Sequence, residues 1–265
     1  MPLTASNARV KEARKLSRRP VRTERRLFLA DGPNAVEAAV GSGVVRELFV
    51  TTAAAEEYAA LVAAAPRTSY VDDRALASLS DSVTPAGLVA VCEFLDVRLD
   101  EALSATSPSA GGGPVTIAAD VRDPGNAGTM IRTTDALGGR AVVLAGTSVD
   151  LYNGKTVRAS AGSVFHLPIA VDPDPAAVVA AARAAGFVVL AADGEGDLSL
   201  DDATDLLAGP TAWLFGNEAR GLPPELADSA DHRVRIPISG SAESLNLSTA
   251  AAICLHETAR VRRQA

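Results

Sequence analysis

The sequence predicts an α/β protein of two domains: a small N-terminal α/β domain over residues 20–103 and a C-terminal domain over 115–265 built on a parallel sheet. Strand-like and helical segments alternate in both parts, which is typical of α/β folds. The strand-like segments after residue 115 are almost continuously apolar, as expected for parallel strands covered on both faces. Residues 104–114, SATSPSAGGGP, have the composition of a linker.

In the N-terminal part, an apolar strand over 27–30 meets the turn Asp31-Gly32-Pro33 and a helix. Further strands are expected at 45–51, SYVDD and GLVAVCEF, with helices over 53–65 and near 73–79. In the C-terminal part, strands are expected at 115–120, 141–146, 187–193, 211–216 and 232–238. Helices are expected at 126–138, 155–161, 174–185, 222–228 and 244–263. Ligands of open α/β sheets lie beyond the carboxyl ends of the strands, so the turns that follow these strands are the candidate sites.

Composition excludes several classes of protein. Hydrophobic residues make up 48% of the chain, yet no run of eighteen apolar residues could span a membrane. The N-terminus lacks the apolar core of a secretory signal, and Cys92 and Cys254 stand in no metal-binding or disulfide pattern. We therefore expect a cytoplasmic protein with no membrane segment and no metal.

Charge is unevenly distributed along the chain. Residues 1–26 form a basic arm with nine Lys or Arg against two Glu, a balance of +7. Since the whole chain has a net charge of −7, residues 27–265 carry a net charge of −14. Such an arm favours a polyanionic partner such as RNA. A solvated, partly frayed terminal helix explains the same pattern.

Three turns at the predicted sheet edge carry polar residues. The first, DVRDPGNAGTMIRTTDALG, contains Asn126, which can cap a helix, and Arg132. The second, FGNEARGL, contains Gly216 and Glu218, and the third, IPISGSAESLNLSTAAAICLHE, contains Ser244 and Asn246. Each has a structural alternative: a helix cap at Asn126 or Ser244, or a surface pair of Glu218 with Arg220. Three such turns at one sheet edge favour a nucleotide-like ligand.

Common nucleotide signatures are absent. The chain has no G-x-x-x-x-G-K-[ST] motif, and DGEGD at 193–197 lacks the third glycine of a dinucleotide fingerprint. A ligand held by main-chain groups without a phosphate cradle fits better, and S-adenosylmethionine is such a ligand.

NAGTMIR, LFGNEARGL and IPISGSAESLNLSTAAAICLHE resemble, in this order, the three motifs of the SpoU–TrmH family of RNA 2′-O-ribose methyltransferases, within the SPOUT superfamily. The resemblance covers roughly 115–260 and implies a parallel sheet with a deep trefoil knot and a homodimer through the C-terminal domain. The general rule against knotted chains could not have predicted this fold. Residues 20–103 are similar to the small L30e-like RNA-binding domain of that family.

The resemblance implies S-adenosylmethionine as cofactor, contacted by Gly216, Ile236 and Leu245. It places around the target ribose the residues Asn126, Arg132, Glu218, Ser244 and Asn246. The family assigns proton removal to the residue at Arg132, but a guanidinium keeps its proton, so a charged Arg132 clamping a phosphate is the alternative.

RNA is the expected partner, with 23S rRNA favoured over tRNA. Basic residues that could contact it are Arg9, Lys11, Arg14, Arg18, Arg19, Lys155 and Arg158. Two other functions stay open: a catalytically silent RNA-binding protein of the same fold, and a nicotinamide-dependent oxidoreductase, which the missing fingerprint disfavours.

Overall fold

The computed structural model describes residues 1–104 and 112–264, and the chain divides into two compact units. The first unit combines Met1–Leu95 with Asp150–His166, and the second combines Asp96–Val149 with Leu167–Ala265. Most of the expected linker, residues 105–111, lies outside the described residues. Residues 150–166, which the sequence assigned to the C-terminal domain, group with the first unit.

The first unit is built on a four-stranded sheet of order β1-β4-β2-β3, in which β4 is antiparallel to β1 and β2, and β2 is parallel to β3. Its elements are α1 (Ala8–Arg14), η1 (Lys15–Ser17), α2 (Arg19–Arg25), β1 (Leu27–Asp31), α3 (Pro33–Ser42), β2 (Val45–Val50), α4 (Thr52–Glu57), α5 (Ala59–Ala64), β3 (Thr68–Tyr70), α6 (Asp73–Ala77), β4 (Leu88–Glu93), α9 (Gly154–Ala159) and η2 (Ser163–Phe165). The single helix expected over 53–65 is two helices, because Tyr58 has a non-helical φ of −110° and ψ of 38°.

The basic arm is a folded part of the first unit. Val10, Ala13 and Leu16 are buried in one core cluster with Phe49. Arg22 is only 4% exposed, and its Nη1 donates to the carbonyl oxygens of residues 16 and 17, both at 2.8 Å. The frayed-helix alternative is therefore wrong: the arm is anchored by its apolar residues and presents basic side chains from that anchor.

Residues 150–166 return to the first unit through charged and aromatic contacts. Asp150 accepts from the Arg22 guanidinium at 2.5 Å. The rings of Phe28 and Tyr152 lie 4.6 Å apart between centroids, and those of Phe28 and Phe165 lie 5.8 Å apart. Burial of three aromatic rings stabilises this association.

The second unit is built on a seven-stranded sheet of order β7-β6-β5-β10-β8-β11-β9, in which each strand runs parallel to its neighbours. Its elements are α7 (Leu99–Leu103), β5 (Val115–Ala119), α8 (Pro124–Ala136), β6 (Ala141–Ala145), β7 (Ile169–Asp172), α10 (Pro175–Ala184), β8 (Val188–Ala192), β9 (Leu198–Ser199), η3 (Leu200–Asp202), α11 (Thr204–Ala208), β10 (Thr211–Phe215), α12 (Pro224–Ala227), β11 (His232–Arg235) and α13 (Leu247–Arg262). The parallel sheet predicted from the apolar strands is confirmed.

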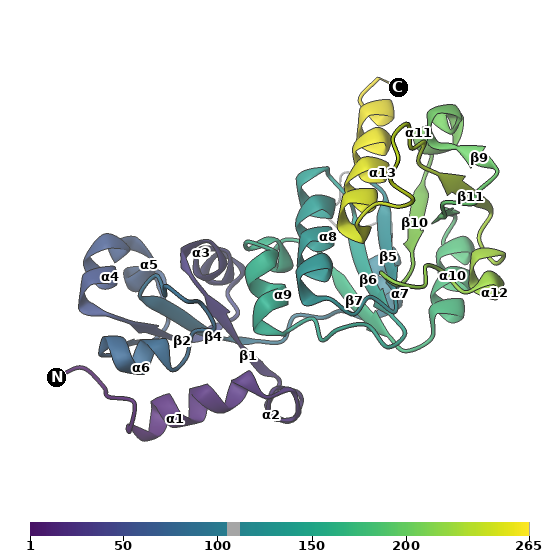
Figure 1. Cartoon of the computed structure of the whole chain (residues 1–265). Helices are drawn as coiled ribbons and strands as arrows, with labels where there is room; N and C mark the ends of the chain where they lie inside the picture. The colour runs from purple at the N-terminus through teal and green to yellow at the C-terminus, as the bar shows by residue number, and fades with distance from the viewer. Residues whose placement is uncertain (105–111, 265) are drawn as a thin grey trace. The chain divides into compact units, whose positions relative to one another are not determined.

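Helices cover both faces of this sheet, as Figure 1 shows for α8 and α13 on one side and α10 on the other. On the α10 face, Val115 and Ile117 join one apolar cluster with Val178. On the α8 and α13 face, buried polar groups are paired: Thr116 Oγ1 lies 2.8 Å from Thr134 Oγ1, and Trp213 Nε1 donates to Thr258 Oγ1 at 2.9 Å. Two buried faces explain why the strands are apolar throughout.

Two strands, β7 and β9, were not expected. They form the two edges of the sheet, and they are short, at four and two residues. Val171 in β7 is 54% exposed, so the segment lacks the continuous burial that marks the inner strands. Among the described residues, no helix is both long and apolar enough to cross a membrane, and no group of His, Cys, Asp or Glu is placed to hold a metal ion.

Candidate functional site

The carboxyl ends of β5, β6 and β10 meet at Asp120. This residue directly follows β5 and has a left-handed backbone with φ of 56°, which aspartate tolerates better than most residues. Its carbonyl oxygen accepts from Asn217 Nδ2 at 2.9 Å, and its Oδ1 accepts from the N–H and Oγ1 of Thr147 at 2.8 and 2.6 Å. The hydrogen bonds from Thr147 hold the pKa of Asp120 below its ordinary value. One ionised carboxylate thus fastens the β6 turn to the β5 turn.

Glu218 joins the β10 loop to the start of α8. Its carboxylate accepts from the main-chain N–H of Asp123 at 2.9 Å and of Arg122 at 3.1 Å, and from Asn126 Nδ2 at 3.2 Å. Partial burial acts to raise the pKa of Glu218, but these hydrogen bonds outweigh it and lower the pKa. The positive end of the α8 dipole acts in the same direction. The alternative of a surface ion pair between Glu218 and Arg220 is wrong: among the described residues, the Glu218 carboxylate is bonded to groups at the start of α8.

The loop after β10 is a tight hairpin that requires glycine at 216. Asn217 and Gly221 exchange main-chain hydrogen bonds, both at 2.9 Å. A Cβ at Gly216 would lie 2.3 Å from the carbonyl carbon of Gly221, closer than real Cβ atoms approach. Glycine at 216 is therefore required because the main chain of Gly221 and Leu222 packs directly against it.

Asn126 and Asn246 bring two of the three motifs into direct contact. Asn246 Nδ2 donates to Asn126 Oδ1 at 3.1 Å, while Asn126 Nδ2 donates to Glu218. The structure therefore links all three motifs in one chain of hydrogen bonds. Two capping predictions are wrong: Asp123, not Asn126, caps α8, and Asn246, not Ser244, caps α13. In both cases the residue nearest the first helical turn reaches its free N–H groups.

The segment between β11 and α13 is open to solvent. All ten residues over 237–246 are exposed, including Ile238 at 40% and Leu245 at 37%. Within the described part of the chain, no main-chain N–H group of residues 236–246 donates a hydrogen bond to a protein acceptor. Main-chain donors and apolar side chains that lack partners at a sheet edge fit a nucleoside-like ligand.

A cavity of about 900 Å³ adjoins the network, lined by Asp120, Thr147, Asn217, Glu218 and the residues that follow to 224. All of its lining belongs to the second unit. Sequence reasoning missed Asp120, Thr147 and Asn217 as site residues. The signal for Asp120 was a charged residue directly after a buried apolar strand, and that for Asn217 was its place between Gly216 and Glu218.

Arg132 is not part of this hydrogen-bonded cluster. It lies on α8, six residues after Asn126, and six residues turn a helix by about 240°, so the two side chains leave different faces. Its side chain is exposed and makes no hydrogen bond or ion pair with a described residue. Ser244, Leu245 and Ile236 lie on the open segment before α13, and none of them bonds to the cluster in the described structure.

The basic residues predicted to contact RNA all lie in the first unit. Arg9 forms an ion pair with Glu47 and donates to Ser69 Oγ at 2.5 Å, so it has a structural partner. Arg19 and Lys155 are exposed at the starts of α2 and α9. The other four line a cavity: Lys11, Arg14, Arg18 and Arg158.

The sequence model of the SpoU rRNA Methylase family matches residues 114–256, and that of the MRM3-like substrate binding domain matches residues 7–90. A relative from Bacillus subtilis named 23S rRNA (guanosine(2553)-2′-O)-methyltransferase is 32% identical over 254 residues, 96% of each chain. A relative from Streptomyces viridochromogenes named 23S rRNA (uridine(2479)-2′-O)-methyltransferase is 42% identical over 144 residues, 52% of this chain and 50% of its own.

Solved structures agree with these relatives. The SpoU methyltransferase AviRb from Streptomyces viridochromogenes, in complex with the cofactor AdoMet, superposes with a TM-score of 0.85 at 32% identity, covering 98% of this chain and 100% of its own. An AdoMet-bound rRNA methyltransferase from Sinorhizobium meliloti superposes with a TM-score of 0.83 at 33% identity, covering 98% and 97%. With the family's motifs joined at one sheet edge and the match spanning more than half of its residues, the chain belongs to the SpoU rRNA Methylase family.

Proposed function

We propose that this protein transfers the methyl group of S-adenosylmethionine to a ribose 2′-hydroxyl of 23S rRNA. The observation that carries the proposal is the hydrogen-bonded chain from Glu218 through Asn126 to Asn246, beside a segment whose main-chain donors have no protein partner. The Bacillus subtilis relative that matches 96% of this chain is named for 2′-O-methylation of 23S rRNA, and AdoMet-bound structures share the fold.

The open segment fits the cofactor. Gly216 shapes the tight loop at the end of β10, while Ile236 and Leu245 offer apolar side chains, and Leu245 is 37% exposed. These three residues are proposed to hold the adenosine part, as the segment's free N–H groups suit the polar edge of an adenine. When bound, the sulfonium of the cofactor supplies an already activated methyl group.

The hydrogen-bonded residues orient the acceptor ribose. The hydrogen bond from Asn246 to Asn126 orients both amide groups. An amide can both donate to and accept from a ribose hydroxyl. Ser244 lies two residues before Asn246 and adds a hydroxyl to the same segment. Alignment of two reactants is the main requirement for a displacement on an activated donor.

We also propose a homodimer through the second unit, but on residues other than those expected. The sequence pattern of the terminal helix suggested a dimer through Leu247, Ala251, Cys254, Leu255 and Thr258. The last four are buried within the unit itself, and Leu247 is half-buried. The supporting features are instead Ile253, which is 36% exposed on α13, and the exposed Arg132 on the neighbouring α8. A second copy would bring Arg132 to a site that it does not reach in one chain.

Two further assignments belong to the same proposal. The strand order β5-β10-β8-β11, followed by a return of the chain to α13 beside α8, is compatible with the trefoil knot of this family. Ribosomal RNA as substrate implies that the protein works in the cytoplasm.

A methylation assay tests the proposed function. The purified protein is incubated with tritiated S-adenosylmethionine and 23S rRNA, 16S rRNA or tRNA, and the modified nucleotide is located by reverse transcription at low nucleotide concentration. Asn246→Ala should lower the rate on 23S rRNA by about 100-fold. Asn34→Ala, which removes an exposed amide from α3 in the first unit, should leave it unchanged. Tritium transfer to tRNA alone, or to no RNA, would contradict the proposal.

A further inference from the structure

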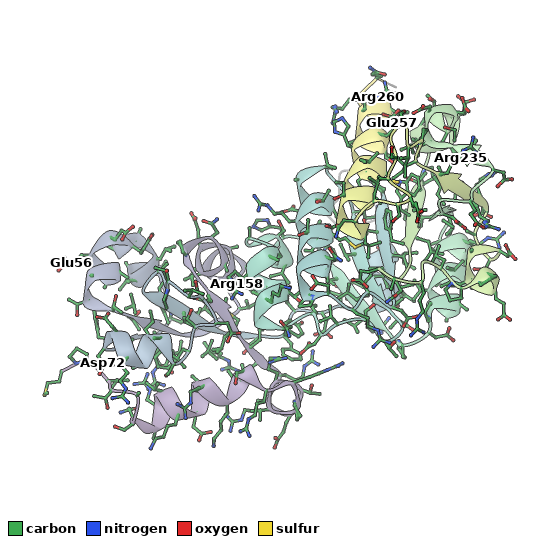
Figure 2. The ribbon with its side chains drawn as sticks, viewed as in Figure 1. Glu56, Asp72, Arg158, Arg235, Glu257 and Arg260 are labelled. Atoms are coloured by element: carbon green, nitrogen blue, oxygen red, sulfur yellow. The ribbon has the colours of Figure 1, made fainter. Side chains whose placement is uncertain are left out.

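The first unit contains a cavity of about 650 Å³ that the methyl-transfer site does not use. Every residue that lines it belongs to this unit, so its shape does not depend on where the second unit lies. Six basic residues from α1, the η1 turn, α2 and α9 surround it: Lys11, Arg14, Lys15, Arg18, Arg22 and Arg158. Figure 2 shows Arg158 on α9.

Two of these cations are already engaged, and four are not. Arg22 is held by Asp150 and two carbonyl oxygens and forms part of the wall, and Lys15 pairs with Glu12 at 2.6 Å. Among the residues that the structure describes, four make no ion pair or hydrogen bond through their side chains: Lys11, Arg14, Arg18 and Arg158. Four uncompensated cations around one cavity favour an anionic ligand with more than one charge.

Two carboxylates line the same cavity. Asp31 Oδ2 accepts from Ser80 Oγ at 2.5 Å, which leaves Oδ1 as an acceptor. Asp81 lies against Gly154, where an added Cβ would stand 2.5 Å from Asp81 Oδ2, so glycine at 154 makes room for this carboxylate. Ionised carboxylates only accept hydrogen bonds. A ligand for this cavity must therefore carry N–H donors as well as negative charge.

An unpaired nucleotide of an RNA strand has both properties. Its phosphates suit the four free cations, and Leu29, Leu79 and Tyr152 provide apolar lining for its base. Guanine suits two carboxylates best, because its N1–H and N2–H₂ are adjacent donors on one edge, whereas uracil has one. An acidic peptide fits poorly, because its carboxylates would meet Asp31 and Asp81.

We infer that this cavity binds an unstacked guanosine nucleotide of the RNA substrate, with its phosphates at Lys11, Arg14, Arg18 and Arg158 and its base edge at Asp31 and Asp81. The inference rests on the proposed function for the identity of the ligand as RNA. It assigns to the first unit a preference for a particular base, in addition to the methyl transfer proposed for the second unit.

Fluorescence anisotropy with the full chain tests the base preference. The probes are labelled 12-nucleotide oligouridylates that carry one central guanosine, inosine, adenosine or uridine. Guanosine should bind about tenfold more tightly than uridine, and inosine, which lacks the 2-amino group, should lose part of that gain. Asp31→Asn and Asp81→Asn should each abolish the preference. Equal affinity for all four probes would overturn the inference.

Two controls separate charge from base recognition. Glu56→Gln removes one negative charge from the exposed surface of α4, well apart from Arg158 in Figure 2, and should keep the guanosine preference. Arg14→Ala should weaken every probe by the same factor and reduce the slope of log affinity against log salt by about 1. A guanosine preference that survives both Asp→Asn changes would overturn the role of the carboxylates.

The methylation assay keeps this inference distinct from the proposed function. With 23S rRNA as substrate, Asp81→Asn should raise KM about tenfold and leave kcat unchanged, because the cavity binds RNA and takes no part in the transfer. A wild-type protein that prefers guanosine but methylates no RNA would overturn the proposed function and leave the cavity assignment intact. A fully active protein without the preference would overturn only the cavity assignment.

Discussion

Glu218→Gln is the substitution that most directly tests how the site is held together. The carboxylate accepts from the main-chain N–H groups of Arg122 and Asp123 and from the amide of Asn126. Glutamine keeps one acceptor oxygen and turns an NH₂ group toward the remaining donors, so about two charge-assisted hydrogen bonds are lost. Such bonds stabilise by about 1.5–3 kcal/mol each when buried, but the exposure of Glu218 reduces this. We expect the free energy of unfolding to fall by about 1–2 kcal/mol.

Trp213 provides the assay. It is the single tryptophan of the chain, it is fully buried, and it lies on β10 five residues before Glu218, so its fluorescence reports on the second unit. The loss corresponds to a fall in the urea midpoint of about 0.5–1 M. Glu225→Gln is the matched control, because Glu225 is exposed and makes no side-chain hydrogen bond with the described residues. Its midpoint should stay near that of the wild type.

The stabilisation of the fold by Glu218 should depend on pH. Hydrogen bonding lowers the pKa of Glu218, so its contribution to stability is fully present above the unfolded pKa of about 4.3 and is lost as pH falls through the lowered folded value. The gap between wild type and Glu218→Gln should therefore be largest at neutral pH and should close in acid below about pH 4. Equal midpoints at pH 7, or a gap that persists unchanged at pH 3, would refute this account of the loop.

Four other outcomes are expected from the same structure. Gly216→Ala places a Cβ 2.3 Å from the Gly221 carbonyl carbon, so the hairpin must open, and calorimetry should show S-adenosylmethionine affinity reduced by more than about tenfold. Burial raises the pKa of the thiols of Cys92 and Cys254, so a thiol reagent should label neither until urea unfolds the protein; rapid labelling of the native protein would contradict this. Arg132→Ala should abolish methylation with cofactor affinity nearly unchanged. Arg132→Lys should stay inactive at all pH values, whereas recovery of rate toward the ordinary lysine pKa of about 10.4 would identify Arg132 as the base.

The inner strands of the second unit could be predicted because both faces of the sheet are covered. Val115 and Ile117 face one helical layer and Thr116 faces the other, so the segment is apolar or small throughout. The edge strands β7 and β9 lack that signal. In the first unit, the return of Asp150 and Tyr152 to Arg22 and Phe28 depends on contacts more than a hundred residues apart, which no local pattern contains.

The candidate site was predictable as a set of turns but not as a bonded arrangement. Parallel strands place their carboxyl ends at one edge, so the sequence could gather Asn126, Glu218 and Asn246 there. It could not show that Glu218 accepts from the start of α8, because that depends on the φ of 56° at Asp120, which directs the chain between β5 and α8. It also gave no indication that Arg132 leaves α8 on a different face from Asn126.

The hydrogen bonds around Glu218 bear on where the ribose proton goes. A general base near neutral pH needs a free lone pair and a pKa close to 7, but Glu218 has its oxygens occupied and its pKa lowered. Asp120 also has a lowered pKa, because Thr147 donates to its Oδ1. The amides of Asn126 and Asn246 cannot accept a proton at this pH. Since the described cluster holds no group with a pKa near 7 and the segment over 237–246 is open to solvent, water is the proton acceptor most consistent with the structure, and a charged Arg132 stays a proposal that the substitutions above test.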